Sequence, residues 1–368
     1  MNRLVYLSPV PWNSFSQRPH KFAEWFHSAT RGEVLWVDPY PTRFPNLADL
    51  RKLSAPPAAP LATPVEPWLK VLPARALPIE PIPGSRLLNS LLWRDLLREI
   101  RDFSAIEETT LGIGKPSELA IQLLKHGSFT STIYDAMDDF PAFYSGMSKW
   151  AMHHRESIVA NRAEHLLASS TVLVNRFANA RKATLCMNAC AIETLPSVDS
   201  LPGRPGERIL GYVGTIGPWF DWAMINRLAM CAQVKIRLIG PMFSPPAAAL
   251  PPNVEMHPQC THAEAIAAMQ GFDVGLIPFK QTELTESVDP IKYYEYRALG
   301  LPVLSSHFGE MRNHAQQSGV FILHEGDDEA TVSSTVETAL EYSCNSEEIT
   351  SFRNQHSWTA RFNSARLL

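Results

Sequence analysis

The sequence has no long hydrophobic run and no excess of charge of one sign. Nowhere do about 18 apolar residues follow one another, so we expect no membrane-spanning helix. The 33 basic and 37 acidic residues give a formal net charge of -4, too balanced to indicate nucleic acid as the main partner. The first apolar run, MNRLVYLSPVPW, is short and soon broken by proline, unlike a signal peptide. We therefore predict a cytoplasmic protein.

Cysteine is scarce and is not spaced for a metal site. The cysteines lack the paired short spacings of a zinc site, and no His and carboxylate pair recurs at helical spacing. We therefore expect free thiols in a reducing cytosol, no metal and no bound cofactor. The five cysteines are Cys186, Cys190, Cys231, Cys260 and Cys344.

The length and composition favour two ordinary domains, because 368 residues with 45% hydrophobic content can bury two cores. The chain opens with an apolar strand at 3–9, a helix at 18–28 and a strand at 33–37. This order predicts a parallel sheet covered by helices, and it starts again near residue 209. We therefore predict an α/β fold of two Rossmann-like domains facing across a cleft, with ligands at the carboxyl ends of the strands.

Proline and glycine mark the expected domain boundaries. We predict a linker at 195–208 between a first domain at 1–194 and a second domain at 209–350. We also predict that residues 351–368 form a helix that returns to the first domain. Prolines are frequent in residues 41–83 and interrupt regular elements there, so we predict one strand in this range. Further strands are predicted at 69–72, 131–134, 165–168, 234–241, 253–258, 273–279, 301–306 and 320–325, and a strand with its following glycine loop at 209–217. Helices are predicted at 149–162, 171–180, 222–232, 262–270, 290–300 and 357–368.

Residues 85–103 predict a single amphipathic helix with arginines at 86, 94, 98 and 101. Two interpretations fit this pattern. The leucines could pack on the sheet, as in most helices of α/β domains. A basic amphipathic helix could instead lie on an anionic membrane, which would give the first domain a peripheral membrane contact.

Residues 289–303 carry the most informative pattern. Pro290 suits the first turn of a helix and Gly300 suits its carboxyl end. Lys292 and Glu295 are three residues apart, so they share one face near the amino end, where free N–H groups favour a phosphate. Lys292 matches a phosphate and Glu295 could accept hydrogen bonds from a ribose. The alternative is an ordinary surface ion pair.

A second candidate ligand loop is GYVGTIG, with Gly214, Thr215 and Ile216 between a strand and a helix. Glycine lets the backbone approach a ligand closely, and the N–H groups that open a helix could meet a phosphate or donor sugar. In an ordinary α/β domain the same glycines only turn the chain.

The motif P-x-K-x-x-E-Y followed by G-x-P-V resembles the donor-binding helix of GT-B glycosyltransferases, and residues 210–229 are similar to the start of their second domain. QRPHKFAEWF and YDAMDDF resemble bacterial polysaccharide and cell-wall enzymes, among them group 1 transferases and the xanthan glucuronosyltransferase. The resemblance implies a hexosyltransferase that uses a nucleoside diphosphate sugar, UDP above all, with a glycan, glycolipid or lipid-linked acceptor at the inner face of the membrane. The implied donor-binding residues are Gly214, Thr215, Ile216, Ile291, Lys292 and Glu295.

The same resemblance implies that Asp138 is the general base. A carboxylate near the acceptor hydroxyl suits an inverting transfer. Its neighbours Asp135 and Asp139 could raise its pKa or cap the following helix. Arg18 and His20, in the loop after the first strand, are expected at the same edge. We predict that Arg18, His20, Asp135 and Asp139 contact the acceptor.

One departure from the family leaves the stereochemistry open. Retaining members carry two glutamates eight positions apart, but Ser287 stands eight before Glu295, with Glu286 beside it. A loop insertion could bring Glu286 into the usual place, or the chain could belong with transferases that keep only the second glutamate. Of the two outcomes, inversion is favoured over retention. A catalytically inactive scaffold of the same fold and a sugar-nucleotide epimerase are the alternative functions.

Overall fold

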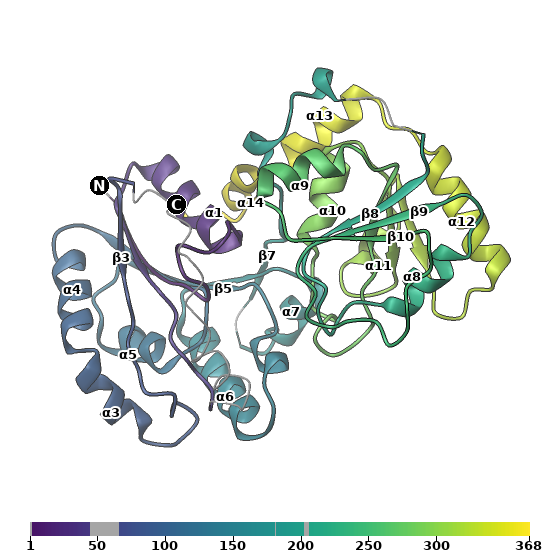
Figure 1. Ribbon diagram of the computed structural model, residues 1–368. Helices are drawn as coiled ribbons and strands as arrows, with labels where there is room; N and C mark the ends of the chain where they lie inside the picture. Colours follow the sequence, from purple (N-terminus) through teal and green to yellow (C-terminus); the bar gives the residue numbers. More distant parts are fainter. Residues whose placement is uncertain (1, 45–65, 181, 202–205) are drawn as a thin grey trace. The chain divides into compact units, whose positions relative to one another are not determined.

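The computed structural model describes residues 2–44, 66–180, 182–201 and 206–368. The chain divides into two compact units, one of Met1–Cys186 with Ala365–Leu368 and the other of Met187–Ser364 (Figure 1). By this division the predicted linker, 195–208, lies inside the second unit. Within the described residues no helix is both long and apolar enough to span a membrane.

The first unit is built on a parallel sheet, whose seven described strands follow the order β3-β2-β1-β4-β5-β6-β7. This is the order of a doubly wound Rossmann-like domain, extended by one strand. Its strands are β1 (Arg3–Leu7), β2 (Val34–Val37), β3 (Leu69–Leu72), β4 (Thr109–Ile113), β5 (Ser131–Ala136), β6 (His165–Ala168) and β7 (Thr184–Leu185). Its helices are α1 (Arg18–Thr30), α3 (Ser85–Leu92), α4 (Arg94–Ser104), α5 (Glu118–His126), η1 (Phe140–Phe143), α6 (Gly146–Arg162) and α7 (Thr171–Arg176).

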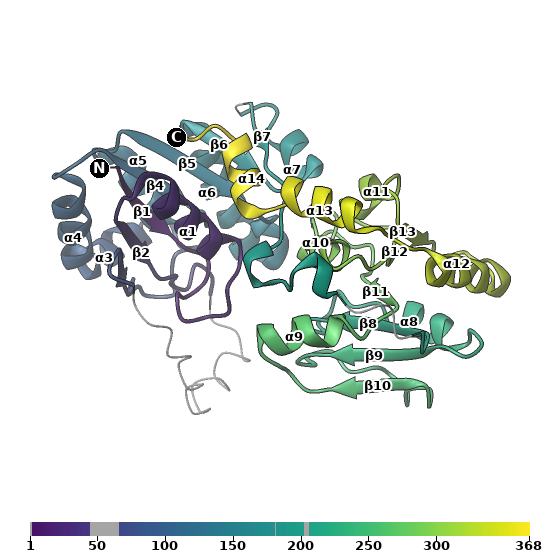
Figure 2. The same cartoon turned by 90° about the horizontal axis from the view of Figure 1, so that it is seen from above.

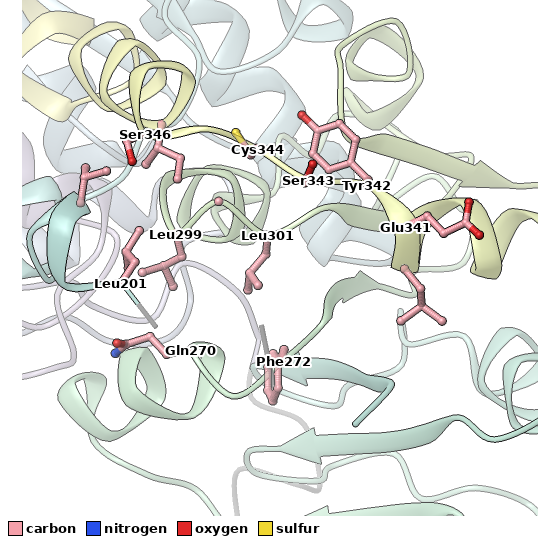
Figure 3. A pocket seen from close by; sticks show the side chains of 14 residues that line it. Leu201, Gln270, Phe272, Leu299, Leu301, Glu341, Tyr342, Ser343, Cys344 and Ser346 are labelled. Atoms are coloured by element: carbon pink, nitrogen blue, oxygen red, sulfur yellow. The ribbon is translucent and has the colours of Figure 1, made fainter. Parts of the chain in front are cut away.

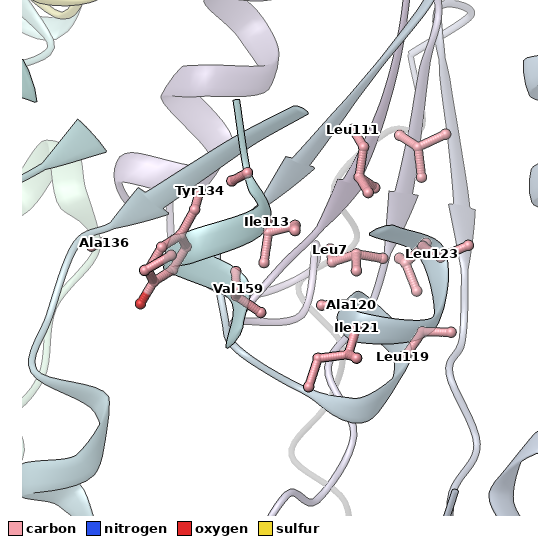
Figure 4. Packing of buried hydrophobic residues seen from close by; sticks show 14 of the residues in the cluster. Leu7, Leu111, Ile113, Leu119, Ala120, Ile121, Leu123, Tyr134, Ala136 and Val159 are labelled. Carbon is pink, nitrogen blue, oxygen red and sulfur yellow. The ribbon is translucent and has the colours of Figure 1, made fainter. Parts of the chain in front are cut away.

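Alternate residues of β1 face the two sides of this sheet, as strand geometry requires. Val5 and Leu7 join a core that α4, α5, α6 and α7 cover, and Figure 4 shows Leu7 among the side chains of β4, β5 and α5. Tyr6 faces the opposite side, where its ring packs at 5.4 Å from Phe22 of α1. Helices therefore cover both faces.

The second unit repeats the plan with six described strands in the order β10-β9-β8-β11-β12-β13, all parallel. Figure 2 shows β8, β9 and β10 side by side. The strands are β8 (Ile209–Val213), β9 (Lys235–Ile239), β10 (Val254–His257), β11 (Val274–Ile277), β12 (Val303–Ser306) and β13 (Val320–Leu323). The helices are η2 (Ile192–Thr194), η3 (Val198–Ser200), α8 (Trp222–Ala229), α9 (His262–Met269), α10 (Ile291–Ala298), α11 (Met311–His314), α12 (Glu329–Glu341), α13 (Ser346–Gln355) and α14 (Trp358–Ser364).

The second sheet also separates two apolar cores. One core joins Val213 and Ile277 to α9 and α10, and the other joins Leu210 and Leu276 to α8 and α12. The central strands β8 and β11 are buried along their whole length, which explains their continuous apolar sequences.

Several predicted elements are confirmed, and the strands at 69–72 and 165–168 match residue for residue. The central strand β4 was not predicted, because the glycine in TTLGI weakens the strand pattern. The fold needs that glycine, since a Cβ at Gly112 would lie 2.5 Å from the Tyr6 ring. Helices α5, α11 and α12 were not predicted either. The single helix predicted over 351–368 is wrong, because the end of α13 and the whole of α14 occupy this range as two helices.

The prediction of one helix over 85–103 is wrong, because the chain forms α3 and α4 with a break at Trp93. Trp93 is fully buried and packs at 5.5 Å from Tyr40. Leu96 and Ile100 of α4 are buried in the core, as the sheet-packing interpretation expects. The α3 leucines are exposed.

Replacing Gly275 with alanine should destabilise the second unit. A Cβ there would lie 2.4 Å from the ring of Tyr296, which fixes α10 against β11. We expect the free energy of unfolding to fall by about 1–3 kcal/mol in urea titration. Gly271→Ala is the matched control, since its Cβ would meet nothing closer than 3.4 Å. Equal stability of the two variants would contradict this account.

Candidate active site

A buried ion pair organises the carboxyl edge of the first sheet. The Arg18 guanidinium, at the start of α1, donates to both carboxylate oxygens of Asp135, with Nη2 2.7 Å from Oδ1 and Nε 3.0 Å from Oδ2. Arg18 Nη1 also donates to the Cys186 carbonyl at 2.7 Å. Both side chains are almost fully buried. Burial would otherwise penalise the guanidinium charge, but Asp135 raises the pKa of Arg18, so the pair stays ionised.

Asp138 lies just beyond β5, beside this pair. Ser169, which follows β6, holds the loop by donating its hydroxyl to the Met137 carbonyl at 2.8 Å. Asp138 is half-buried, and no described residue hydrogen-bonds to its carboxylate. Burial raises the pKa of Asp138 to about 7; Arg18 opposes this shift, and Asp135 and Asp139 add to it. A carboxylate without a partner and with a pKa near neutrality suits a general base.

Asp139 belongs to a different cluster. Its carboxylate pairs with Arg176 of α7, which also pairs with Glu156 of α6. Tyr134 donates its hydroxyl to Glu156 at 3.0 Å, and burial raises the pKa of Glu156 to about 7. Asp139 precedes η1 but makes no side-chain capping bond. Its predicted contact with the acceptor stays a prediction.

His20 uses both of its ring nitrogens inside the first unit. Nδ1 accepts a hydrogen bond from the Gln17 N–H at 3.2 Å, and Nε2 lies 3.1 Å from the Trp12 carbonyl. Burial lowers the pKa of His20, so the ring is neutral with its proton on Nε2. These contacts account for the position of the His20 ring without a bound acceptor substrate. Its predicted contact with that substrate stays a prediction.

In the second unit, the predicted donor helix is α10, with Pro290 at its amino end and Gly300 beyond its carboxyl end at φ 78°. Lys292 and Glu295 form an ion pair across one turn. Glu295 is buried and Lys292 is half-buried, so the pair is more enclosed than an ordinary surface pair. The backbone N–H groups of Ile291 and Lys292 belong to the first turn of the helix, where an anion is favoured.

A buried carboxylate that the sequence did not single out fixes the start of α10. Asp289 accepts hydrogen bonds from the Asn188 N–H at 2.7 Å and from the Tyr294 hydroxyl at 2.9 Å. His314 Nε2 lies 3.2 Å from its other oxygen. Asp289 precedes Pro290 in sequence, but Asn188 and His314 come from other segments of the chain, so no sequence pattern identified it.

The end of β8, just before the second candidate ligand loop, lies beside α10, because the Val213 N–H donates to the Tyr296 hydroxyl at 3.2 Å. Ile216 uses both of its backbone groups against the segment after β9, accepting from Phe243 N–H and donating to the Pro241 carbonyl. A Cβ at Gly214 would lie 2.7 Å from the Tyr212 hydroxyl. Local packing therefore explains Gly214, and the donor roles of Gly214, Thr215 and Ile216 stay predictions.

The segment before α10 contains Ser287, at the position of the first glutamate in retaining members of the resembled family, and Glu286 beside it. Glu286 forms an ion pair with Arg312 at 2.5 Å. Ser287 is buried, and its hydroxyl lacks a hydrogen-bond partner among the described residues. The described residues also contain no group of three or more His, Cys, Asp or Glu side chains arranged to hold a metal ion.

A pocket of about 480 Å³ opens at the opposite edge of the second sheet (Figure 3). Gln270 and Phe272 precede β11, and Leu299 and Leu301 precede β12, so the pocket lies at the amino ends of these strands. Tyr342 also lines it. Open parallel sheets bind ligands at the carboxyl ends of strands, so this pocket is separate from the candidate donor site.

No protein-family model matches the chain. The chain is similar in sequence to the putative teichuronic acid biosynthesis glycosyltransferase TuaH of Bacillus subtilis (strain 168), with 26% identity over 224 residues. The similar region covers 54% of this chain and 56% of TuaH, so the chain spans about half the length of this relative.

Solved structures match nearly the whole chain. Sucrose-phosphate synthase from Thermosynechococcus elongatus gives a TM-score of 0.67 at 13% identity, with 100% of this chain and 98% of that chain covered. The E. coli structure described as trehalose-6-phosphate bound with UDP-2-fluoro glucose gives 0.61 at 10% identity, with 100% and 99% covered. These neighbours are GT-B glycosyltransferases.

The chain has the GT-B fold. The two parallel sheets, each with helices on both faces, are the two Rossmann-like parts of a GT-B chain. The predicted fold class is therefore confirmed. In this GT-B chain the first sheet brings Arg18, Asp135 and Asp138 together, and the second brings α10 beside the end of β8.

Removing Arg18 should destabilise the first unit strongly. Arg18→Met leaves the Asp135 carboxylate buried and unpaired, which costs about 3–5 kcal/mol in the free energy of unfolding. Urea titration measures the loss. The double variant Arg18→Met/Asp135→Leu should recover part of it, because no lone charge remains. A single variant as stable as the wild type would contradict the importance of this pair.

Proposed function

We propose that the protein is a glycosyltransferase that moves a sugar from a nucleoside diphosphate sugar to a glycan, glycolipid or lipid-linked acceptor. The similarity to TuaH, whose name places it in teichuronic acid biosynthesis, carries this proposal. It also supports a role in the synthesis of a bacterial cell-surface polysaccharide. The GT-B fold is compatible with it, since the solved neighbours include synthases and other glycosyltransferases.

We propose a UDP-sugar as the donor, bound at the amino end of α10 and the loop after β8. Two structural neighbours are described with UDP-2-fluoro glucose or UDP bound. At α10 the first-turn N–H groups and Lys292 would meet the diphosphate, and Glu295 would accept from the ribose hydroxyls. On binding, the ion pair between Lys292 and Glu295 would open, and each side chain would contact the ligand instead.

Asp138 would act as the general base. Its carboxylate would take the proton from the acceptor hydroxyl as the new bond forms between that oxygen and the anomeric carbon. The bond from the anomeric carbon to the diphosphate oxygen would break, and the diphosphate would leave with the electron pair. Lys292 and the α10 amino end would stabilise its charge.

Inversion at the anomeric carbon is part of this proposal, and the sugar is proposed to be a hexosyl group. Ser287 stands where retaining members of the resembled family have a glutamate, and Glu286 is paired with Arg312. A single displacement with Asp138 as base needs no second carboxylate. NMR of the product's anomeric proton would decide between inversion and retention.

Binding of a UDP-sugar should stabilise the wild type and depend on Lys292. At about 100 times the dissociation constant, a ligand adds about 2.7 kcal/mol to the stability of the folded protein. Lys292→Ala should weaken the binding by about ten- to a hundredfold, because a charge-assisted contact to the diphosphate is lost. Calorimetry and thermal shift against UDP-, GDP-, dTDP- and CMP-sugars measure both effects.

Lys235→Ala is the matched control, since Lys235 is an exposed lysine of the same unit paired with Glu207 at 3.5 Å. It should bind like the wild type. If no nucleotide sugar binds the wild type at millimolar concentration, the transferase proposal fails. The alternative of an inactive scaffold would then be the better account.

Asp138→Asn should lower kcat by about 10²–10⁴ if Asp138 is the base. The wild-type kcat/KM should rise with pH through about 7, because the carboxylate must be ionised to accept a proton. The variant should lose this limb of the pH profile. An assay of transfer to a sugar acceptor, in which the released UDP is monitored, measures the loss of kcat and the pH profile.

The pH dependence of stability separates a catalytic loss from misfolding. A raised pKa means that folding favours the protonated Asp138, so the wild type loses stability as pH rises from the ordinary Asp range to about 7. Asp138→Asn should therefore be at least as stable as the wild type above pH 7. Asp102→Asn, at an exposed site of the same unit, is the control. Full activity of Asp138→Asn would exclude the base assignment.

A further inference from the structure

Helix α3 turns its apolar side to the solvent. Four leucines of its eight residues are exposed, with fractions of 71% for Leu87, 54% for Leu88, 57% for Leu91 and 50% for Leu92. These positions share one face of the helix at i, i+1, i+4 and i+5. A contiguous exposed apolar face is unusual on a water-soluble surface and marks a site of interaction.

The polar side of α3 is the buried one, so its orientation is fixed. Ser85 and Asn89 are buried, and the Asn89 side chain accepts from the Leu77 N–H at 2.8 Å and donates to the Leu77 carbonyl at 3.3 Å. Trp93, one turn further, is fully buried. A rotation that hid the leucines would break these two hydrogen bonds and expose Trp93. The leucines therefore stay outside.

The charges next to the leucines are positive. Between residues 75 and 94 the basic residues are Arg75, Arg86 and Arg94, and the acidic residue is Glu80. Glu80 is fully buried and accepts from the Tyr40 hydroxyl at 2.6 Å. The next acidic residue, Asp95, is paired with Arg98 at 3.2 Å. Arginines beside an exposed apolar face match an anionic lipid surface.

The start of α3 lies at the carboxyl edge of the first sheet. Glu80 also accepts from the Glu118 N–H, 2.7 Å away at the start of α5, which follows β4, and Tyr40 follows β2. Asp138 follows β5 and so belongs to the same edge. Further exposed apolar side chains stand at this edge, where Phe143, Met147 and Trp150 lie in η1 and the start of α6.

We propose that α3 docks the protein on an anionic membrane, with the leucines inserted among the acyl chains and the arginines against lipid phosphates. The docking proposal rests on the proposed function only where it names the acceptor. That acceptor would be a lipid-linked molecule, presented at the membrane surface to the edge of the sheet where Asp138 lies. A second copy of the chain fits this apolar face less well than an anionic membrane does. A symmetric contact through α3 would bring arginines of both copies together.

Vesicle binding tests the proposal. The full chain is sedimented with vesicles of phosphatidylcholine alone and with vesicles that contain about one third phosphatidylglycerol. We expect strong binding to the anionic vesicles and weak binding to the neutral ones. Leu87→Gln/Leu91→Gln should weaken the binding by about tenfold or more, because glutamine keeps the helix but cannot enter the acyl region. Arg86→Gln/Arg94→Gln should remove the preference for anionic lipid.

Met230→Gln is the matched control, because Met230 is 70% exposed in the second unit and should leave vesicle binding unchanged. Light scattering of the same samples reports self-association. Absence of wild-type binding, or equal binding by Leu87→Gln/Leu91→Gln, would overturn the proposal. So would a wild-type dimer that these substitutions dissociate, since it would assign the leucines to a second copy.

The donor assay separates this proposal from the transferase proposal. Leu87→Gln/Leu91→Gln should bind a UDP-sugar like the wild type, because α3 is not part of the candidate donor site. Vesicle binding without any nucleotide-sugar binding would reject the transferase and leave the docking surface standing. Nucleotide-sugar binding without vesicle binding would reject the docking surface alone.

Discussion

The pair of Arg18 and Asp135 is the constraint on which the first unit depends. The guanidinium of Arg18, the first residue of α1, joins this helix to the end of β5 and to the carbonyl of Cys186, which lie 117 and 168 residues further along the chain. Two buried charges are tolerated here because each satisfies the other and because Nη1 of Arg18 also donates to a carbonyl. The same pair sets the electrostatic surroundings of Asp138, since Arg18 favours its ionised form and Asp135 disfavours it.

The second unit uses a buried carboxylate in a comparable way. Asp289 fixes the start of α10 by accepting hydrogen bonds from Asn188 and Tyr294 and by facing His314. Tyr296 then holds the helix against the end of β8. With these anchors the first-turn N–H groups of α10 are positioned before any ligand arrives. Such preorganisation lowers the entropic cost of binding an anion.

Helix α3 shows why amphipathic periodicity alone cannot say which face of a helix is buried. The arginine and leucine pattern of residues 85–103 fits both packing on a sheet and docking on a membrane. In the fold, α4 follows the first interpretation through Leu96 and Ile100, and α3 leaves its leucines outside. Two hydrogen bonds between the Asn89 side chain and the Leu77 backbone, together with the burial of Trp93, decide the difference, and no periodic pattern contains that information.

The sequence by itself determined the α/β class, the restart of the strand and helix pattern, the position of α10 between Pro290 and Gly300, and the placement of Asp138 after a strand. These features depend on local periodicity and on the backbone preferences of proline and glycine. Tertiary structure alone decided that Gly112 belongs to a central strand, since its lack of a side chain makes room for Tyr6. It alone decided that His20 is held neutral between two backbone groups, and that Asp139 pairs with Arg176 while Asp138 has no partner among the described residues. Adjacent residues of one type have the same local signals, and their roles separate only when distant chain segments pack around them.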